Sequence, residues 1–160
     1  MDADSLLQLQ RIIRSQRIAA LGTLRDGAPL VSMVLFTPSE DFASFHIHVS
    51  RLAQHTQDIL KDPRVSLMIA ETDRGDQDPQ TLARLSIRGE AIAVPADTSA
   101  YDNVRTIYLR KFPGSAFNFE LGDFSLYSIH PKTCRYVAGF AKTFNLSLDD
   151  LKGAATAPAS

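Results

Sequence analysis

The sequence contains a single cysteine, Cys134, so no disulfide can form within the chain. It carries 17 Lys and Arg against 18 Asp and Glu, a formal net charge of −1, without runs of basic residues. Because binding to a nucleic-acid backbone depends on positive charge, this balance argues against a nucleic-acid partner. The sequence also lacks an apolar run of membrane-spanning length and the basic start and apolar core of a signal peptide. We therefore expect a cytoplasmic protein with no membrane partner.

Several chemical motifs are missing as well. There is no G-x-G-x-x-G, no Walker loop and no G-x-S-x-G; a Ser–His–Asp triad stays open on residue types alone, with no nucleophile elbow to mark it. His46 and His48 would point to the same side of a strand, as a metal site requires. A third ligand is missing, because His55 falls in a predicted helix and no carboxylate lies between Asp41 and Asp58. We predict no metal site and expect the two strand histidines to line a cleft or the surface.

The hydrophobic pattern predicts mainly strands. With 160 residues, 44% of them hydrophobic, the chain is most simply one domain. Apolar spacing predicts a helix over residues 5–16, and Asp26-Gly27 is typical of a hairpin turn. Gly89, in the middle of the longest β-like run, indicates a bulge or a close backbone approach. The predicted strands are Ile18–Leu24, Leu30–Phe36, Phe45–Val49, Arg64–Ala70, Leu82–Val94, Phe124–Ile129 and Arg135–Phe140, and a further helix starts at Asp97 or Thr98.

These elements predict a mainly β (α+β) fold, a six- to seven-stranded closed antiparallel barrel with peripheral helices. A doubly wound parallel sheet is disfavoured because strands and helices do not alternate. The predicted domain covers residues 1–146, and residues 147–160 form a C-terminal tail.

Ser50 stands where an extended run meets a helical pattern that ends before Asp62-Pro63. This position predicts a helix N-cap directly after a strand. The free amides and the positive dipole end of such a helix can bind a phosphate. The donors expected around it are Ser50, Arg51, Gln54, His55 and Thr56. The alternative is that Ser50 only caps the helix and that the polar side chains face water.

A set of short motifs then carries a family resemblance over residues 5–146. The motifs are S-x-V at 32–34, S-R-L-A-Q-H-T at 50–56, D-P-R-V-S-L at 62–67, A-R-L-S-I-R-G-E at 83–90, Y-L-x-x-F-P at 108–113, G-D-F-x-L-Y at 122–127 and A-G-F-A-K at 138–142. In their order and spacing the chain resembles the FMN-binding split-barrel proteins related to pyridoxamine 5′-phosphate oxidase. Within these it is most similar to the haem-utilisation branch.

The resemblance implies a homodimer with FMN at the subunit interface. It implies that a first group of residues lines the flavin and its phosphate and that a second group meets the phosphate from the helix. Arg84 occupies a strand position that approaches the flavin ring in the family. The residues that would line the flavin and its phosphate are Ser32, Met33, Val34, His48, Val49 and Ser50. Those that would meet the phosphate from the helix are Gln54, His55 and Thr56.

The sequence departs from the true oxidases, which place Arg and Lys where this chain has Ser32, Thr37, Gln54 and His55. Their C-terminal Arg-x-His motif has no counterpart either. The resemblance therefore implies a flavin-dependent oxidoreductase acting on a small molecule other than pyridoxamine phosphate, with no catalytic acid or base assigned. One alternative is a haem-binding or haem-degrading protein on the same fold, and another is a flavin-binding module without turnover.

The haem alternative lacks its usual ligand, because some haem-degrading relatives take it from a C-terminal histidine and no histidine follows His130 here. An axial ligand would have to come from His46, His48, His55, His130 or a different group. We expect weak haem binding and no efficient ring opening.

Overall fold

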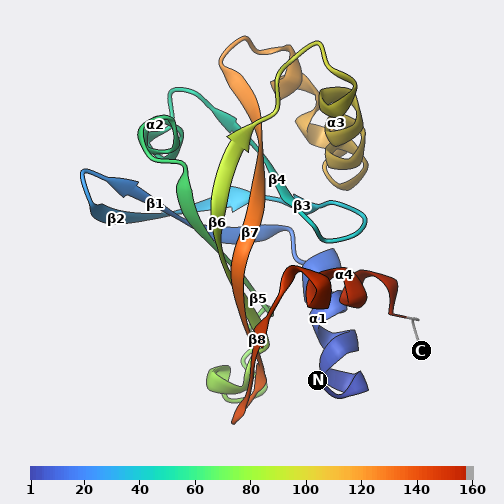
Figure 1. The fold of residues 1–160 in the computed structure, drawn as a ribbon. Coiled ribbons are helices and arrows are strands. Elements are labelled where there is room, and N and C mark those ends of the chain that lie inside the picture. The colour runs from blue at the N-terminus through green and yellow to red at the C-terminus, as the bar shows by residue number, and fades with distance from the viewer. Residues whose placement is uncertain (158–160) are drawn as a thin grey trace.

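The structure is a computed structural model that describes residues 1–157. Eight strands form one antiparallel sheet in the order β2-β1-β5-β6-β7-β4-β3, with β8 paired to β7 (Figure 1). The strands are β1 (Ile18–Arg25), β2 (Ala28–Leu35), β3 (Thr37–Pro38), β4 (Phe45–Ser50), β5 (Arg64–Ala70), β6 (Arg84–Ala93), β7 (Phe124–Gly139) and β8 (Lys142–Leu146). The helices are α1 (Ala3–Ser15), α2 (Gln54–Lys61), α3 (Ser99–Lys111) and α4 (Leu148–Thr156), with 3-10 turns η1 (Pro79–Thr81) and η2 (Pro113–Glu120).

The two edges of the sheet are joined by one buried residue. β2 and β3 lie at opposite ends of the strand order, yet only Phe36 separates them in the chain. The chain therefore crosses from one edge to the other at this point, and the sheet curls into a barrel. This confirms the predicted antiparallel split barrel with peripheral helices; the two-residue β3 was expected to be loop.

The core follows from the alternation of side chains along the strands. Val65, Leu67 and Ile69 of β5 are buried and their neighbours point outward, and β6 alternates in the same way. Helices α1 and α4 lie side by side at one end of the barrel (Figure 1) and add Leu9 and Leu151 to the core. Residues 148–156, expected within a tail, thus form a packed helix; residues 158–160 of that tail lie outside the described residues.

Gly89 explains a second difference between the predicted and the observed strands. The runs Phe124–Ile129 and Arg135–Phe140, expected as two strands, form one continuous strand, β7. The register of β6 against β7 shifts between Arg88 and Gly89, where Pro131 enters the ladder without an N–H group. A Cβ on Gly89 would collide with the His130 carbonyl oxygen. The predicted close approach at Gly89 is confirmed, and it lets β7 pass through His130-Pro131 unbroken.

Candidate functional site

Helix α2 begins later than expected. Its N-cap is Ala53, which offers no side-chain hydrogen bond, and its first helical residue is Gln54. The Ser50 hydroxyl instead donates to Asp123 Oδ2 at 2.7 Å and accepts from the Leu52 amide at 3.1 Å. The predicted N-cap at Ser50 is therefore wrong, because a carboxylate distant in sequence binds its hydroxyl. Arg51 donates to the Gly122 carbonyl and so ties the same turn to the start of β7.

Two of the predicted phosphate residues meet beside α2. Ser32 Oγ on β2 lies 3.2 Å from His55 Nδ1 on α2. His55 Nε2 and the Thr56 hydroxyl are enclosed without hydrogen-bond partners among residues 1–157. Burial lowers the pKa of His55 from its ordinary value, so the ring is neutral at pH 7. Near this helix start the protein therefore offers neutral hydrogen-bonding groups.

A buried carboxylate lies below the same helix. Asp58 is fully buried and accepts hydrogen bonds from Thr23 Oγ1 at 3.0 Å, Arg25 Nε at 3.0 Å and Gln54 Nε2 at 2.7 Å. Burial acts to raise the pKa of Asp58, but the bonds from Gln54 and Thr23 and the Arg25 guanidinium hold it below its ordinary value. Asp58 is therefore ionised and fastens α2 to β1. The Gln54 amide, predicted to meet a phosphate, is bound to it.

The strand histidines are buried. His48 is 8% exposed and stacks on Phe119 with ring centroids 3.7 Å apart, while Tyr108 meets it edge-on. His46 is 4% exposed and places Nδ1 2.8 Å from Ser128 Oγ. The expectation that these rings line a cleft or the surface is wrong. No group of three metal-binding side chains occurs among the described residues.

The remaining predicted residues divide between the core and the outer face of the sheet. Val34 and Val49 are buried in the core. Met33 is 65% exposed on the outer face of β2, and Arg84 projects from β6 on that same face. The structure therefore separates Met33 and Arg84 from the Ser32–His55 pair.

One row of paired residues crosses this outer face. Residues opposite one another in neighbouring antiparallel strands point to the same side. Val31, which is 69% exposed, and Ile18, which is also exposed, add apolar side chains beside the β2 and β1 end of this row. The strand registers give the row as Met33, Ala20, Met68, Ser86, Arg135 and Asn145, from β2 to β8. Around this row the face is thus apolar over β2, β1 and Met68 of β5 and carries arginines on β6 and β7. Farther along β5 and β6, Arg64 and Glu90 lie on the same face.

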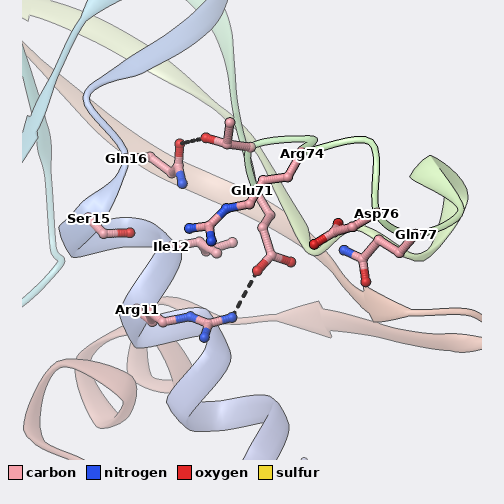
Figure 2. A pocket seen from close by; sticks show the side chains of 9 residues that line it. Arg11, Ile12, Ser15, Gln16, Glu71, Arg74, Asp76 and Gln77 are labelled. Carbon is pink, nitrogen blue, oxygen red and sulfur yellow. Dashed lines mark hydrogen bonds and ion pairs between the residues drawn. The ribbon is translucent and has the colours of Figure 1, made fainter.

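A hollow of about 540 Å³ lies over the apolar half, lined by Ile18, Val31, Met33 and Met68 together with small residues. It adjoins a polar cavity of about 410 Å³ between α1 and the loop after β5, with which it shares Gln16, Glu71 and Thr72 (Figure 2). In that cavity Arg11 pairs with Glu71 at 2.8 Å, and the Thr72 hydroxyl donates to Gln16 at 3.2 Å (Figure 2). These bonds close the α1 end of the apolar hollow.

Sequence reasoning did not identify Ala20, Met68 and Arg135 as parts of one face. The alternation in β5 marks Met68 as outward-facing. The meeting of Met68 with Arg135, however, depends on the strand order β5-β6-β7, which local patterns do not encode. The row can hold a flat apolar molecule with an anionic edge, and it offers no catalytic acid or base.

Comparisons with known proteins agree with this fold. The family model described as pyridoxamine 5′-phosphate oxidase matches residues 7–138. The chain is 40% identical over 119 residues to the chloroplastic non-canonical heme oxygenase HOZ of Arabidopsis thaliana, covering 74% of this chain and 35% of that protein. It is 26% identical over 127 residues to the heme oxygenase HutZ of Vibrio cholerae, covering 78% of this chain and 70% of that protein.

Among solved structures, a heme binding protein from Mycobacterium smegmatis superposes with a TM-score of 0.82 at 22% identity, over 93% of this chain and 60% of that one. At this identity the likeness shows the fold alone. The chain spans about a third of the length of the Arabidopsis relative. No helix among residues 1–157 combines the length and apolar character needed to cross a membrane. The family match covers most of the chain and agrees with the observed barrel, and the chain therefore belongs to the pyridoxamine 5′-phosphate oxidase family.

Proposed function

We propose that this domain binds haem on the outer face of its sheet and serves haem utilisation. The observation that carries the proposal is the row from Met33 to Arg135, in which an exposed apolar strip adjoins arginines. Haem has a flat apolar ring and carboxylates along one edge, and both parts match this face. The names of the Arabidopsis and Vibrio relatives support the same ligand class.

The residues present fit the ring and its carboxylates but supply no imidazole beside Met33 and Met68. Within residues 1–157, His46 and His48 are buried among other side chains, and His55 Nε2 is enclosed beside α2. His130 is exposed on this outer face, but it lies opposite Glu90, four residues along β6 from Ser86. When bound, haem supplies the redox chemistry of its iron. The chain's own part is to hold the ring against Met33 and Met68 and to exclude water from one side of it. The proposal is therefore haem binding, without ring opening.

FMN is the second candidate, and the Ser32–His55 contact favours it. Ser32, His55 and Thr56 gather where the family resemblance places the flavin phosphate. Neutral donors bind a phosphate less strongly than cationic ones, and ionised Asp58 lies below the same helix. Any FMN affinity should therefore be modest, and it should rise on acidification only below the ordinary pKa of histidine, because burial lowers the pKa of His55.

Titration of the purified chain with hemin and, separately, with FMN decides between the two. We expect a saturable Soret band with about one haem per protomer and weaker quenching of flavin fluorescence. For FMN, His55→Ala should cost on the order of 1–2 kcal/mol of binding. Ser50→Ala should cost nothing, because Asp123 binds its hydroxyl. Tight FMN binding without a saturable Soret band would reverse the order of the candidates.

A homodimer is proposed on the same face, so that the haem would lie at the subunit interface, where the family resemblance places the cofactor. Val31 and Met33 are each more than half exposed, and contiguous apolar surface of this kind marks association sites. We expect a dimer by light scattering at micromolar concentration, with an interface above roughly 2,000 Å² in total. Met33→Glu should yield monomers, whereas Leu60→Glu, at an equally exposed apolar position on α2, should leave the dimer intact. A monomeric parent protein would contradict this prediction.

A further inference from the structure

The basic end of the outer face holds two arginines as neighbours. Arg135 on β7 lies directly opposite Ser86 on β6, and Arg84 stands two residues from Ser86 on the same face. The two arginines are therefore diagonal neighbours, about 7–8 Å apart at their Cα atoms. Neither has a carboxylate within ion-pair distance in the part of the chain the structure describes. Two like charges placed side by side repel, so an anion bound between them would be stabilised by both.

The space between them is hollowed. A cavity of about 500 Å³ lies over β6, β7 and β8, and none of its lining residues is acidic. The Ser86 and Thr143 side chains add hydroxyl donors to its wall, and Phe140 lies at the tip of the β7–β8 hairpin. This hairpin passes beside η1 at the lower end of the sheet (Figure 1).

The fold holds the Arg84 guanidinium in place, and one long contact orients that of Arg135. Arg84 Nη1 donates to the carbonyls of Gln80 at 3.2 Å and Leu82 at 3.1 Å, which leaves its other nitrogens free. Arg135 Nη1 lies 3.4 Å from Asn145 Oδ1 on β8. A guanidinium that is already oriented loses less conformational entropy when it binds a carboxylate with two parallel hydrogen bonds.

The cavity adjoins the apolar hollow where β5 pairs with β6. Ala70 of the apolar hollow lies opposite Arg84, and Met68 lies opposite Ser86. Met68 and Arg135 are two strand spacings apart, roughly 10 Å. A ligand that covers both spaces must therefore combine a flat apolar body with an acidic group on one edge.

We infer that Arg84 and Arg135 form a carboxylate-binding subsite that receives the acidic side chains of the haem ring and thereby fixes its orientation on the sheet. The inference rests on the proposed haem function. Arg84 was predicted from the family resemblance to approach a cofactor ring, whereas Arg135 had no predicted role. In this subsite the two guanidinium groups act together on one anionic edge of the ligand.

The test compares hemin with hemin dimethyl ester, in which both carboxylates are blocked, in one buffer. The parent protein should bind the ester roughly tenfold more weakly than hemin. Arg135→Gln should weaken hemin binding by a similar factor and leave ester binding unchanged. Arg135→Lys should recover part of the loss, because it restores the charge but not the planar fork. The matched control is Arg88→Gln on the same face of β6, which removes one charge outside this cavity and should bind both ligands as the parent does.

The two hypotheses fail in different ways. If the parent binds hemin and its ester equally and Arg135→Gln changes neither, the carboxylate subsite is wrong while haem binding stands. If Arg88→Gln weakens hemin as much as Arg135→Gln does, the effect is one of general charge and the subsite is again wrong. If neither hemin nor the ester gives a saturable Soret band, both the subsite and the proposed function are overturned.

Discussion

Acidification from pH 7 to pH 5 should lower the free energy of unfolding by about 2 kcal/mol for each of the two buried strand histidines. Burial, with a further contribution from the charge of His130, lowers the pKa of His46 to about 4. Burial also lowers the pKa of His48 to about 4. In the unfolded chain both rings return to an ordinary pKa near 6.5. Between pH 6.5 and about 4 the unfolded state therefore binds more protons, so stability falls as the pH falls and levels off below about 4.

The carboxylates contribute little to the change between pH 7 and pH 5. The shifted aspartates, including Asp41, Asp58 and Asp62, have pKa values lowered from 3.8, so their contribution is lost from about pH 5 downward. His55 shifts in the same direction as the strand histidines and adds to the loss. The acid sensitivity between pH 7 and pH 5 is therefore assigned to histidines.

Urea unfolding at pH 7 and pH 5 measures this loss of unfolding free energy. The variant His48→Phe removes the part of the loss that is due to His48. The phenyl ring keeps the stack on Phe119 and removes the buried Nε2 that has no partner. We expect this variant to lose about 2 kcal/mol less than the parent between the two pH values, with no loss of stability at pH 7. An NMR titration in which the His46 or His48 ring protonates above pH 6 would refute the explanation.

Much of the fold could be predicted because its signals are local. The Asp26-Gly27 turn, the alternation in β6 and the Thr98 cap of α3 need only neighbouring residues. Helix α4 also had such a signal, since Ser147 and Asp150 form a capping box. The Ala-rich composition after Gly153 led to the prediction of a C-terminal tail instead.

The site was less predictable because its contacts are distant in sequence. Ser50 has the chemistry of an N-cap, but Asp123 lies 73 residues away and binds its hydroxyl. His48 was predicted to be polar-facing, because no local pattern shows that Phe119 covers it. The outer-face row likewise requires the strand order, which brings Met68 and Arg135 within two strands of each other.

Replacing Gly89 with Ala should be among the most damaging single changes in the barrel. Its added Cβ would overlap the carbonyl oxygen and carbon of His130 and lie 3.3 Å from the Pro131 Cα, and all of these atoms belong to the backbone of β7. Backbone in the middle of a paired strand cannot rotate away as a side chain can, so β6 and β7 must separate at the bulge. We expect a loss of roughly 2–4 kcal/mol, which corresponds to a fall of roughly 4–16 °C in Tm for a chain of this size.

Gly22→Ala supplies the matched control for the Gly89 variant. Gly22 also lies in the middle of a strand, but a Cβ there would approach the Ser66 Cβ at 3.5 Å, an ordinary contact. Because glycine weakens a strand interior, alanine at position 22 should leave Tm unchanged or raise it. Thermal unfolding of the two variants beside the parent measures the difference. Equal Tm values for Gly89→Ala and Gly22→Ala would show that β7 can shift at His130-Pro131, and the bulge would then not be needed to keep β7 continuous.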